Sequence, residues 1–175
     1  DIHILCAFPE YDKVLAYKNW LWQKIRPIQN DVDHFGYQLV VDAHNDIVRE
    51  EPILLIQGAG WEVDQVVAKT QEMGGLAILA HVDRPSFSYP AALGPMPQDY
   101  PADAFELSWR ATSEEAGEWR TKYPGRAFIR SSDSHMLSGF SRAHCTKMYL
   151  EEPTFDEIRK AIKGEDGRRI SWPWG

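Results

Sequence analysis

The sequence predicts an α/β fold, in which strands and helices alternate along the chain. Two observations carry this prediction. Residues 76–80, Leu-Ala-Ile-Leu-Ala, form a continuous apolar run, which is typical of a strand buried on both faces of a parallel sheet or barrel. The preceding segment, 61–73, has the apolar spacing of a helix. It ends at Gly74-Gly75, where glycine accepts the left-handed conformation of a helix C-terminus.

The N-terminal part follows from the same periodicities. Apolar residues recur every three or four positions after Glu10, until Pro27 stops the helix. The predicted elements are a strand over 2–6, a helix from Glu10 to Ile25, and a hairpin of strands 37–41 and 47–48 around the polar turn 42–46.

The C-terminal part continues the alternation. The Pro-rich stretch 83–101 predicts an active-site loop or lid, because an apolar strand follows it at once. The predicted elements after it are strand 104–107, helix 113–122, strand 127–130, strand 147–150, a helix opened by the capping box Thr154–Glu157, and the aromatic tail 171–175.

Composition predicts one globular domain over residues 1–175, since 43% of the residues are hydrophobic. The formal net charge of −7 and the absence of a Lys/Arg run disfavour broad nucleic-acid binding. The same acidic balance leaves phosphate chemistry open, because bound metal cations can reverse the local field.

The cysteines and the apolar stretches of the sequence indicate the cellular compartment. Cys6 and Cys145 lack metal-site spacing, so we expect two reduced thiols in a cytoplasmic protein. No apolar stretch reaches membrane-spanning length and no signal peptide is visible. Because Asp1 opens almost directly on a strand, we expect further sequence upstream.

Metal-capable side chains stand within or just after apolar strands. His3 lies in the first strand, His81 follows the run 76–80, and Asp133-Ser-His135 follows strand 127–130. Ligands of α/β folds bind at the carboxyl ends of strands. In an extended segment, side chains two residues apart point the same way, so Asp133 and His135 could approach one metal cluster.

Each of these residues also has a structural interpretation. His3 could be a core histidine with a satisfied hydrogen bond, and His81 could cap its strand. Asp133 could be the N-cap of a short helix through Met136-Leu137. Several coincidences at strand ends favour one site over separate structural roles.

Other polar residues carry weaker signals. Arg84 could bind a substrate phosphate through its planar fork, or form an ion pair within the loop. Glu106, inside an apolar strand, could support a metal ligand or pair with an arginine. Among the remaining histidines, His34 and His44 are expected to be solvated, and His144 is left open.

Together these segments resemble the later motifs of the PHP (polymerase and histidinol phosphatase) family of metal-dependent phosphoesterases. The resemblance rests on Ile2-His3-Ile4-Leu5, on the Gly74-Gly75 lead into Ala80-His81, and on Ser132-Asp133-Ser134-His135. The string Gly75–Pro85 and the segment Gly36–Val41 are similar to a bacterial subgroup of stand-alone PHP proteins.

The resemblance implies a distorted seven-stranded β/α barrel of the TIM-like kind, here lacking the first strands. It implies two or three divalent metal ions (Zn, Mn or Fe), with His3, His81, Asp133 and His135 as ligands. Asp133 and His81 are then the expected catalytic residues, Arg84 binds substrate, and Glu106 supports the ligands. The family's His-x-His, Asp-His and Glu motifs come before the strand that contains His3, and this chain starts two residues before His3, so it does not include them.

The implied activity is hydrolysis of a phosphoester in a small phosphorylated metabolite or nucleotide by the multinuclear metal site. Two alternatives stand beside it. One is a catalytically silent PHP-like module used for binding or regulation. The other is a DNA-processing nuclease accessory, against which the acidic balance counts. The sequence names neither the substrate, the metal nor the oligomeric state.

Overall fold

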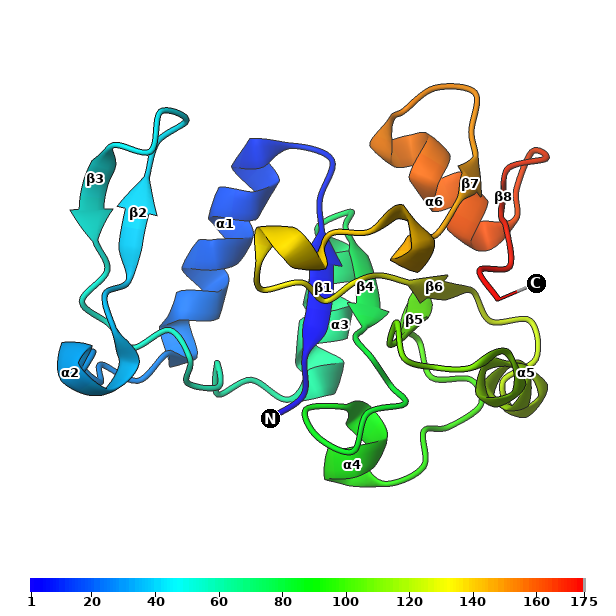
Figure 1. Ribbon diagram of the computed structural model, residues 1–175, viewed down its shortest axis with the longest axis horizontal. Helices are drawn as coiled ribbons and strands as arrows, with labels where there is room; N and C mark the ends of the chain where they lie inside the picture. Colours follow the sequence, from blue (N-terminus) through cyan, green and yellow to red (C-terminus); the bar gives the residue numbers. More distant parts are fainter. Residues whose placement is uncertain (175) are drawn as a thin grey trace. The chain divides into compact units, whose positions relative to one another are not determined.

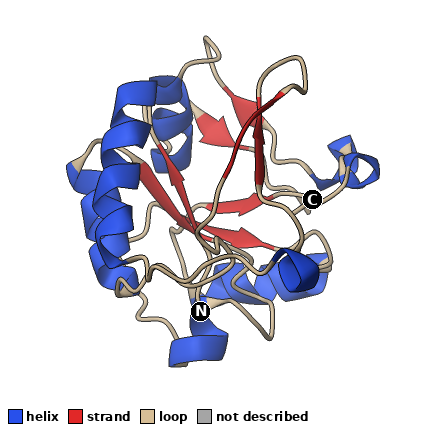
Figure 2. Cartoon of the chain, turned by 90° about the vertical axis from the view of Figure 1, so that its left-hand side faces the viewer, coloured by secondary structure: helices blue, strands red, loops and turns tan. Residues whose placement is uncertain are grey.

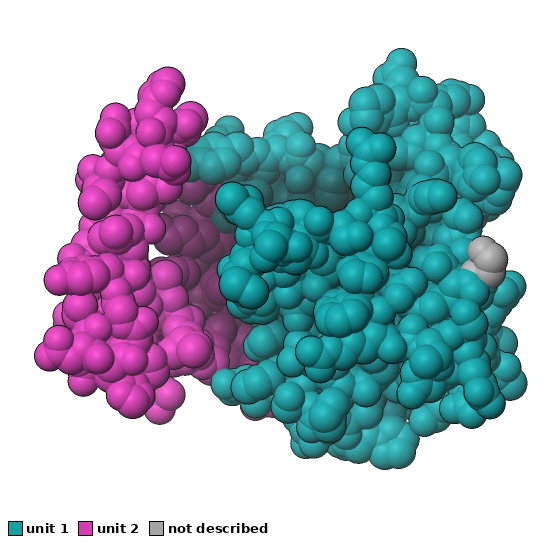
Figure 3. Space-filling view, in the orientation of Figure 1, with its two compact units in different colours: residues 1–14, 63–175 teal, residues 15–62 magenta. Residues whose placement is uncertain are grey.

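A computed structural model describes residues 1–174, which divide into two compact units (Figure 3). One unit comprises residues 15–62, and the other comprises residues 1–14 together with the chain from Val63 onward. Compactness alone does not show that a unit folds independently, so the single domain over 1–175 stays a prediction. No helix within residues 1–174 is long and apolar enough to cross a bilayer.

The unit of residues 15–62 contains little regular structure. Its elements are the end of α1 (Tyr11–Leu21), a 3-10 turn η1 (Trp22–Lys24), α2 (Val32–Phe35), β2 (Leu39–Val41) and β3 (Ile47–Glu50). The predicted hairpin is confirmed, with Leu39 opposite Glu50. The Asp42 carboxylate closes its turn by accepting the amides of His44 at 2.8 Å and Asp46 at 3.0 Å.

The larger unit is built on a four-stranded sheet of order β1-β4-β5-β6 (Figure 1). Its strands are β1 (Ile4–Ala7), β4 (Leu76–Leu79), β5 (Ala104–Leu107) and β6 (Phe128–Arg130). β4, β5 and β6 are parallel, whereas β1 pairs antiparallel with β4. The expected barrel is not seen: within residues 1–174 the sheet stays open, because β1 and β6 are edge strands that do not pair with each other.

Both faces of this sheet are covered, as the apolar run of β4 predicts. Alternate residues point to opposite faces. Leu79, Phe105 and Phe128 pack on one face in a core cluster with residues of α3 (Val63–Glu72) and α5 (Ser113–Lys122). This cluster also contains Met96, Tyr100, Tyr123 and Trp174. Ile78 and Ala104 pack on the other face with Ile162 of α6 (Phe155–Lys163). Figure 2 shows the strands in red from a second direction.

The remaining elements of the larger unit are α3 (Val63–Glu72), α4 (Tyr89–Leu93), α5 (Ser113–Lys122), the 3-10 turns η2 (Leu137–Gly139) and η3 (Arg142–His144), β7 (Met148–Tyr149), α6 (Phe155–Lys163) and β8 (Arg169–Ile170). The helices predicted over 61–73 and 113–122 are confirmed. A reciprocal capping box between Thr112 and Glu115 opens α5.

Among the helices and strands, α2, α4 and β8 were not predicted. Helix α4 lies inside the stretch predicted as irregular, where Ser88 caps it by accepting the amide of Ala91 and Pro90 occupies the first turn. Proline is compatible with that position, since its missing amide has no helical partner there. Strand β8 is only two residues long and exists through its pairing with β7, so no local pattern announces it.

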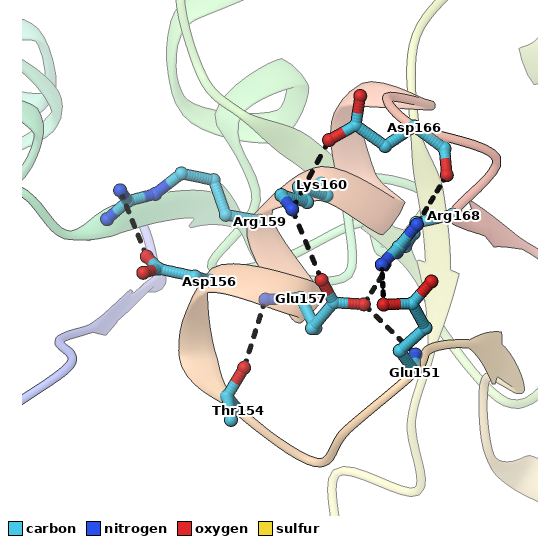
Figure 4. A network of polar contacts seen from close by, with 8 residues as sticks. All are labelled: Glu151, Thr154, Asp156, Glu157, Arg159, Lys160, Asp166 and Arg168. Atoms are coloured by element: carbon cyan, nitrogen blue, oxygen red, sulfur yellow. Dashed lines mark hydrogen bonds and ion pairs between the residues drawn. The ribbon is translucent and has the colours of Figure 1, made fainter.

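An ion-pair network fixes the C-terminal elements (Figure 4). The Glu157 side chain, 11% exposed, accepts hydrogen bonds from the Arg168 guanidinium at 2.7 Å and from the backbone amide of Glu151 at 3.0 Å. Arg168 also pairs with the Glu151 carboxylate. Lys160 lies 3.3 Å from Glu157 and 3.2 Å from Asp166. The network therefore joins α6 to the turn before it and to β8.

The network predicts an acid-sensitive part of the protein's stability. The Arg168 guanidinium, followed by the Glu151 amide, lowers the pKa of Glu157 from an ordinary value of 4.5 to about 2. Between these values the unfolded chain binds more protons, so this stabilisation is complete above pH 4.5 and disappears as the pH falls toward 2. Glu157→Gln should lose less of its unfolding free energy between pH 7 and pH 3 than the wild type, in urea titrations. Glu118→Gln, at an exposed carboxylate of α5, is the control and should keep the wild-type acid profile.

Candidate active site

Two histidines meet at one end of the sheet. Because β1 runs antiparallel to β4, Ile4 lies opposite Leu79, and His3 reaches the carboxyl end of β4 where His81 stands. His3 Nδ1 lies 3.2 Å from His81 Nε2, and the rings meet edge to face with centroids 5.2 Å apart. The register thus explains how a histidine at the start of one strand joins a histidine after the end of another.

His81 is held in a constrained position. It is 2% exposed, and its φ of +30° is a conformation that non-glycine residues rarely adopt. Its backbone amide donates to Glu106 Oε2 at 3.3 Å. Its Nδ1 atom is buried and has no hydrogen-bond partner within the described chain. This is not the nitrogen that faces His3, because the 3.2 Å contact between the two rings is made by Nε2 of His81.

Phe87 flanks the histidine pair, and no sequence signal singled it out. Its ring stacks on His3 with centroids 5.0 Å apart, and its carbonyl accepts the His3 amide at 2.9 Å. Phe87 has a φ of +58° and Asp133 a φ of +45°. Three of the five non-glycine residues with positive φ therefore lie at this end of the sheet. Strained backbone of this kind concentrates at functional sites.

Glu106 lies beneath the histidines in β5, 3% exposed. It accepts hydrogen bonds from the Ser131 hydroxyl and from the backbone of His81, and within residues 1–174 it has no arginine partner. The arginine pair is therefore not observed in this part of the chain, and the supporting role of Glu106 stays a prediction. Burial raises the pKa of Glu106, and the two hydrogen bonds oppose that rise.

Asp133 and His135 make separate contacts. The Asp133 carboxylate forms an ion pair with the Arg84 guanidinium at 2.7 Å. The His135 ring turns back, with Nδ1 3.0 Å from the carbonyl oxygen of Asp133. The expected extended geometry fails because φ at Asp133 is +45°. The N-cap interpretation is also wrong, since η2 begins at Leu137 after Met136 and no side chain caps it.

Asp83 closes the loop after β4 onto β5 and was not singled out by the sequence. Its carboxylate accepts the Ser108 amide at 2.7 Å and the Ser108 hydroxyl at 2.6 Å. A pocket of about 490 Å³ opens beside this contact. Its walls include Asp83, Arg84, Trp109, Arg110, Asp133 and His135. His144, left open by the sequence, stacks on the pocket residue Trp109 with centroids 4.9 Å apart.

The electrostatics of the site favour neutral imidazoles. Burial, followed by the charge of His81, lowers the pKa of His3. Burial, followed by the Arg84 guanidinium, lowers the pKa of His81. The negative charge of Asp133 opposes both shifts. A neutral imidazole is the form that binds a metal ion.

The imidazoles of His3 and His81 fit a metal ion as two of its ligands, and the described residues supply no third ligand beside them. Two Zn–N bonds of about 2.0–2.1 Å at a tetrahedral angle separate their nitrogens by about 3.3 Å. The observed separation of 3.2 Å matches this value. Within residues 1–174, however, no three His, Cys, Asp or Glu side chains converge closely enough to hold a metal ion. The expected four-residue cluster is therefore not assembled within residues 1–174: His3 meets His81, Asp133 is paired with Arg84, and His135 contacts the Asp133 carbonyl oxygen.

Comparison with known proteins gives the fold a context. No protein-family model matches the chain. The uncharacterized protein YqxK of Bacillus subtilis is 25% identical over 179 residues, which cover 99% of this chain and 40% of YqxK. The chain thus spans well under half of that relative.

Two solved structures share the fold. The lesion-specific endonuclease PfuEndoQ of Pyrococcus furiosus matches 97% of this chain, and 37% of its own, with a TM-score of 0.63 and 21% identity. Endonuclease Q bound to a 27-mer duplex with an abasic lesion at the active site matches 97% of this chain, and 38% of its own, with a TM-score of 0.60. The chain has a mixed α/β fold with a partly parallel sheet that resembles part of Endonuclease Q.

Proposed function

We propose that this chain forms part of the active site of a metal-dependent phosphodiesterase that acts on DNA. The observation that carries the proposal is the convergence of His3 and His81 at 3.2 Å beside the Arg84–Asp133 ion pair, at the carboxyl end of the parallel strands. The likeness to Endonuclease Q supports DNA over the small phosphorylated metabolite that the sequence favoured. It thereby supports the nuclease alternative.

His3 and His81 are the metal ligands in this proposal. A bound divalent metal would polarise the phosphate and lower the pKa of a water molecule, so that hydroxide is available near neutral pH. Glu106 accepts the backbone amide of His81 and would help to hold the segment that carries the imidazole. His135 is left out of this ligand pair because within residues 1–174 it does not converge with His3 and His81; its Nδ1 contact with the Asp133 carbonyl leaves Nε2 available for other partners.

Arg84 and Asp133 provide the phosphate contact and the proton acceptor. A phosphodiester oxygen can replace Asp133 as the partner of the Arg84 fork, since guanidinium binds phosphate and carboxylate with the same bidentate geometry. The exchange frees the Asp133 carboxylate to ligate the metal or to accept a proton. The adjoining pocket of about 490 Å³ lies within the range of small-molecule sites and suits a single nucleotide.

The rest of the metal shell is proposed to come from parts of the natural protein outside these residues. This chain covers 40% of YqxK, so a protein of that length has room for further ligands. Zn, Mn and Fe remain the candidate metals.

A silent binding module is the second candidate, and one observation favours it. The only aspartate of the predicted ligand set is neutralised by Arg84, and the described residues offer two converging metal ligands. Such a module would retain the pocket but would not hydrolyse a phosphodiester.

The natural full-length protein tests the proposal. After chelation, Zn²⁺ or Mn²⁺ is restored, and hydrolysis is measured on a duplex with one abasic site, an unmodified duplex, bis(p-nitrophenyl) phosphate and p-nitrophenyl phosphate. We expect metal-dependent cleavage of the diesters and little action on the monoester. Hydrolysis of the monoester alone would contradict the nuclease proposal and would support a phosphatase that acts on small metabolites. A protein that retains no metal and cleaves none of the four would be the silent module.

A further inference from the structure

A second pocket, of about 260 Å³, lies in the larger unit and is lined by cations. Arg120 of α5, Arg126 before β6, Lys163 at the end of α6 and Arg169 of β8 all contribute to its walls, and no Asp or Glu lines it. The aromatic residues Phe128 and Trp172 also line the pocket. In a chain of net charge −7, four cations around one hollow are a strong local reversal of charge.

These cations differ from their neighbours in having no carboxylate partner. On the adjoining surface Arg159, Lys160 and Arg168 are all paired with carboxylates (Figure 4). The cations of this pocket are Arg120, Arg126, Lys163 and Arg169. None of them takes part in an ion pair within residues 1–174. Four like charges that share no counterion repel one another, so the arrangement gains stability when an anion enters.

Aromatic and backbone contacts hold the guanidinium groups in place. Arg120 lies over the Trp172 ring at 5.0 Å, and Arg169 lies over the Tyr149 ring at 3.9 Å. Arg126 donates to the Gln98 carbonyl at 3.2 and 3.1 Å. A guanidinium that is already oriented loses less conformational entropy when it binds an anion.

The C-terminus of α6 lies beside the pocket, and its partial negative charge does not cancel the positive potential of the four cations. The C-terminus of α6 carries partial negative charge on its last carbonyl groups. Gly164, with a φ of +69°, lets the chain turn back, so that the Lys160 carbonyl accepts the Glu165 amide at 2.9 Å. Satisfied carbonyls repel an incoming anion less than free ones do.

We propose that this cationic pocket binds a backbone phosphate of DNA, at a second site away from the cleaved bond. The inference rests on the proposed function for the choice of DNA as the source of that phosphate. The volume falls below the range of about 300–1,000 Å³ for sites that enclose whole small molecules, which favours one phosphate group inserted from a larger polyanion.

The pocket is separate from the candidate active site. It is lined by Gly125–Phe128, at the beginning of β6, whereas Asp133 follows the end of that strand. β6 spans three residues, or about 10 Å at 3.3 Å per residue. A phosphate here therefore positions the nucleic acid and does not take part in the chemistry.

The test compares two charge-matched double variants of the natural full-length protein. Lys163→Gln/Arg169→Gln removes two exposed cations of the pocket, and Lys13→Gln/Lys69→Gln removes the same charge from α1 and α3. Binding of a fluorescent duplex of about 20 base pairs is measured by anisotropy from about 0.05 to 0.3 M salt. Hydrolysis of bis(p-nitrophenyl) phosphate is measured in parallel.

We expect the pocket variant to bind DNA at least about tenfold more weakly than the control variant near 0.1 M salt, with a log–log salt slope shallower by about one to two. Its rate on the small diester should match the wild type. Equal DNA affinity of the two variants would contradict the proposal that the cationic pocket binds a DNA phosphate. Loss of affinity in the pocket variant, without diester hydrolysis by the wild type, would support the pocket and refute the proposed function.

Discussion

Replacement of His81 by asparagine should lower hydrolysis of a phosphodiester by at least about 100-fold, because loss even of a residue that merely orients a metal ligand costs roughly 10–100-fold. The substitution removes the imidazole that faces His3 at 3.2 Å. Asparagine is chosen because it tolerates the φ of +30° at this position better than most residues do. The measurements are the rate on bis(p-nitrophenyl) phosphate and the metal content of the purified natural protein.

His44→Asn is the matched control. It makes the same change at an exposed histidine of the β2–β3 turn, which donates its backbone amide to the Asp42 carboxylate. The control should keep its rate and its metal. A cooperative urea transition in both variants would show that they fold. Wild-type hydrolysis and full metal content in His81→Asn would contradict the assignment of His81.

Truncation of Phe105 to alanine should reduce the free energy of unfolding by about 3–5 kcal/mol, the usual cost of removing a buried phenyl ring. Phe105 is fully buried at the centre of the sheet. Its ring meets those of Tyr123 and Phe128 with centroids 5.5 and 5.8 Å away. Since whole domains are stable by about 5–15 kcal/mol, the loss should move the urea midpoint strongly.

Phe140→Ala serves as the control for this experiment. The Phe140 side chain is 71% exposed, so its removal should change the free energy of unfolding by no more than about 0.5 kcal/mol. Equal midpoints for Phe105→Ala and the wild type would show that the β5 cluster does not form the core of the larger unit.

Much of the fold could be predicted because its elements depend on neighbours in the sequence. Residues 76–79 of the apolar run form β4, in which every residue is buried, and the predicted strand 104–107 coincides with β5. Helix 113–122 was predictable from Thr112 and Glu115, since a capping box acts over three residues. Local sequence patterns could not predict β8 or whether the sheet closes into a barrel, because both depend on pairing between strands that are distant in sequence.

The site was partly predictable for the same reason. His81, Asp133 and Arg84 stand just after strands, and the carboxyl ends of parallel strands meet at one edge. The inference about Asp133 and His135 assumed extended backbone, which the φ of +45° at Asp133 removes. Phe87 and Asp83 carry no pattern of their own, and they matter through contacts with His3 and Ser108.

Local patterns in the chain thus determine where the strands and helices lie and which polar residues follow the strands, since these depend on periodicity and capping within a few residues. Pairing between distant segments decides the rest. The antiparallel register of β1 brings His3 to His81, and folding joins Arg84 to Asp133 across 49 positions. The cationic pocket likewise gathers residues of α5, α6, β8 and the turn before β6, and no run of basic residues in the sequence marks it. Such contacts are invisible to local rules, because they arise when separate segments bury their apolar faces on one sheet.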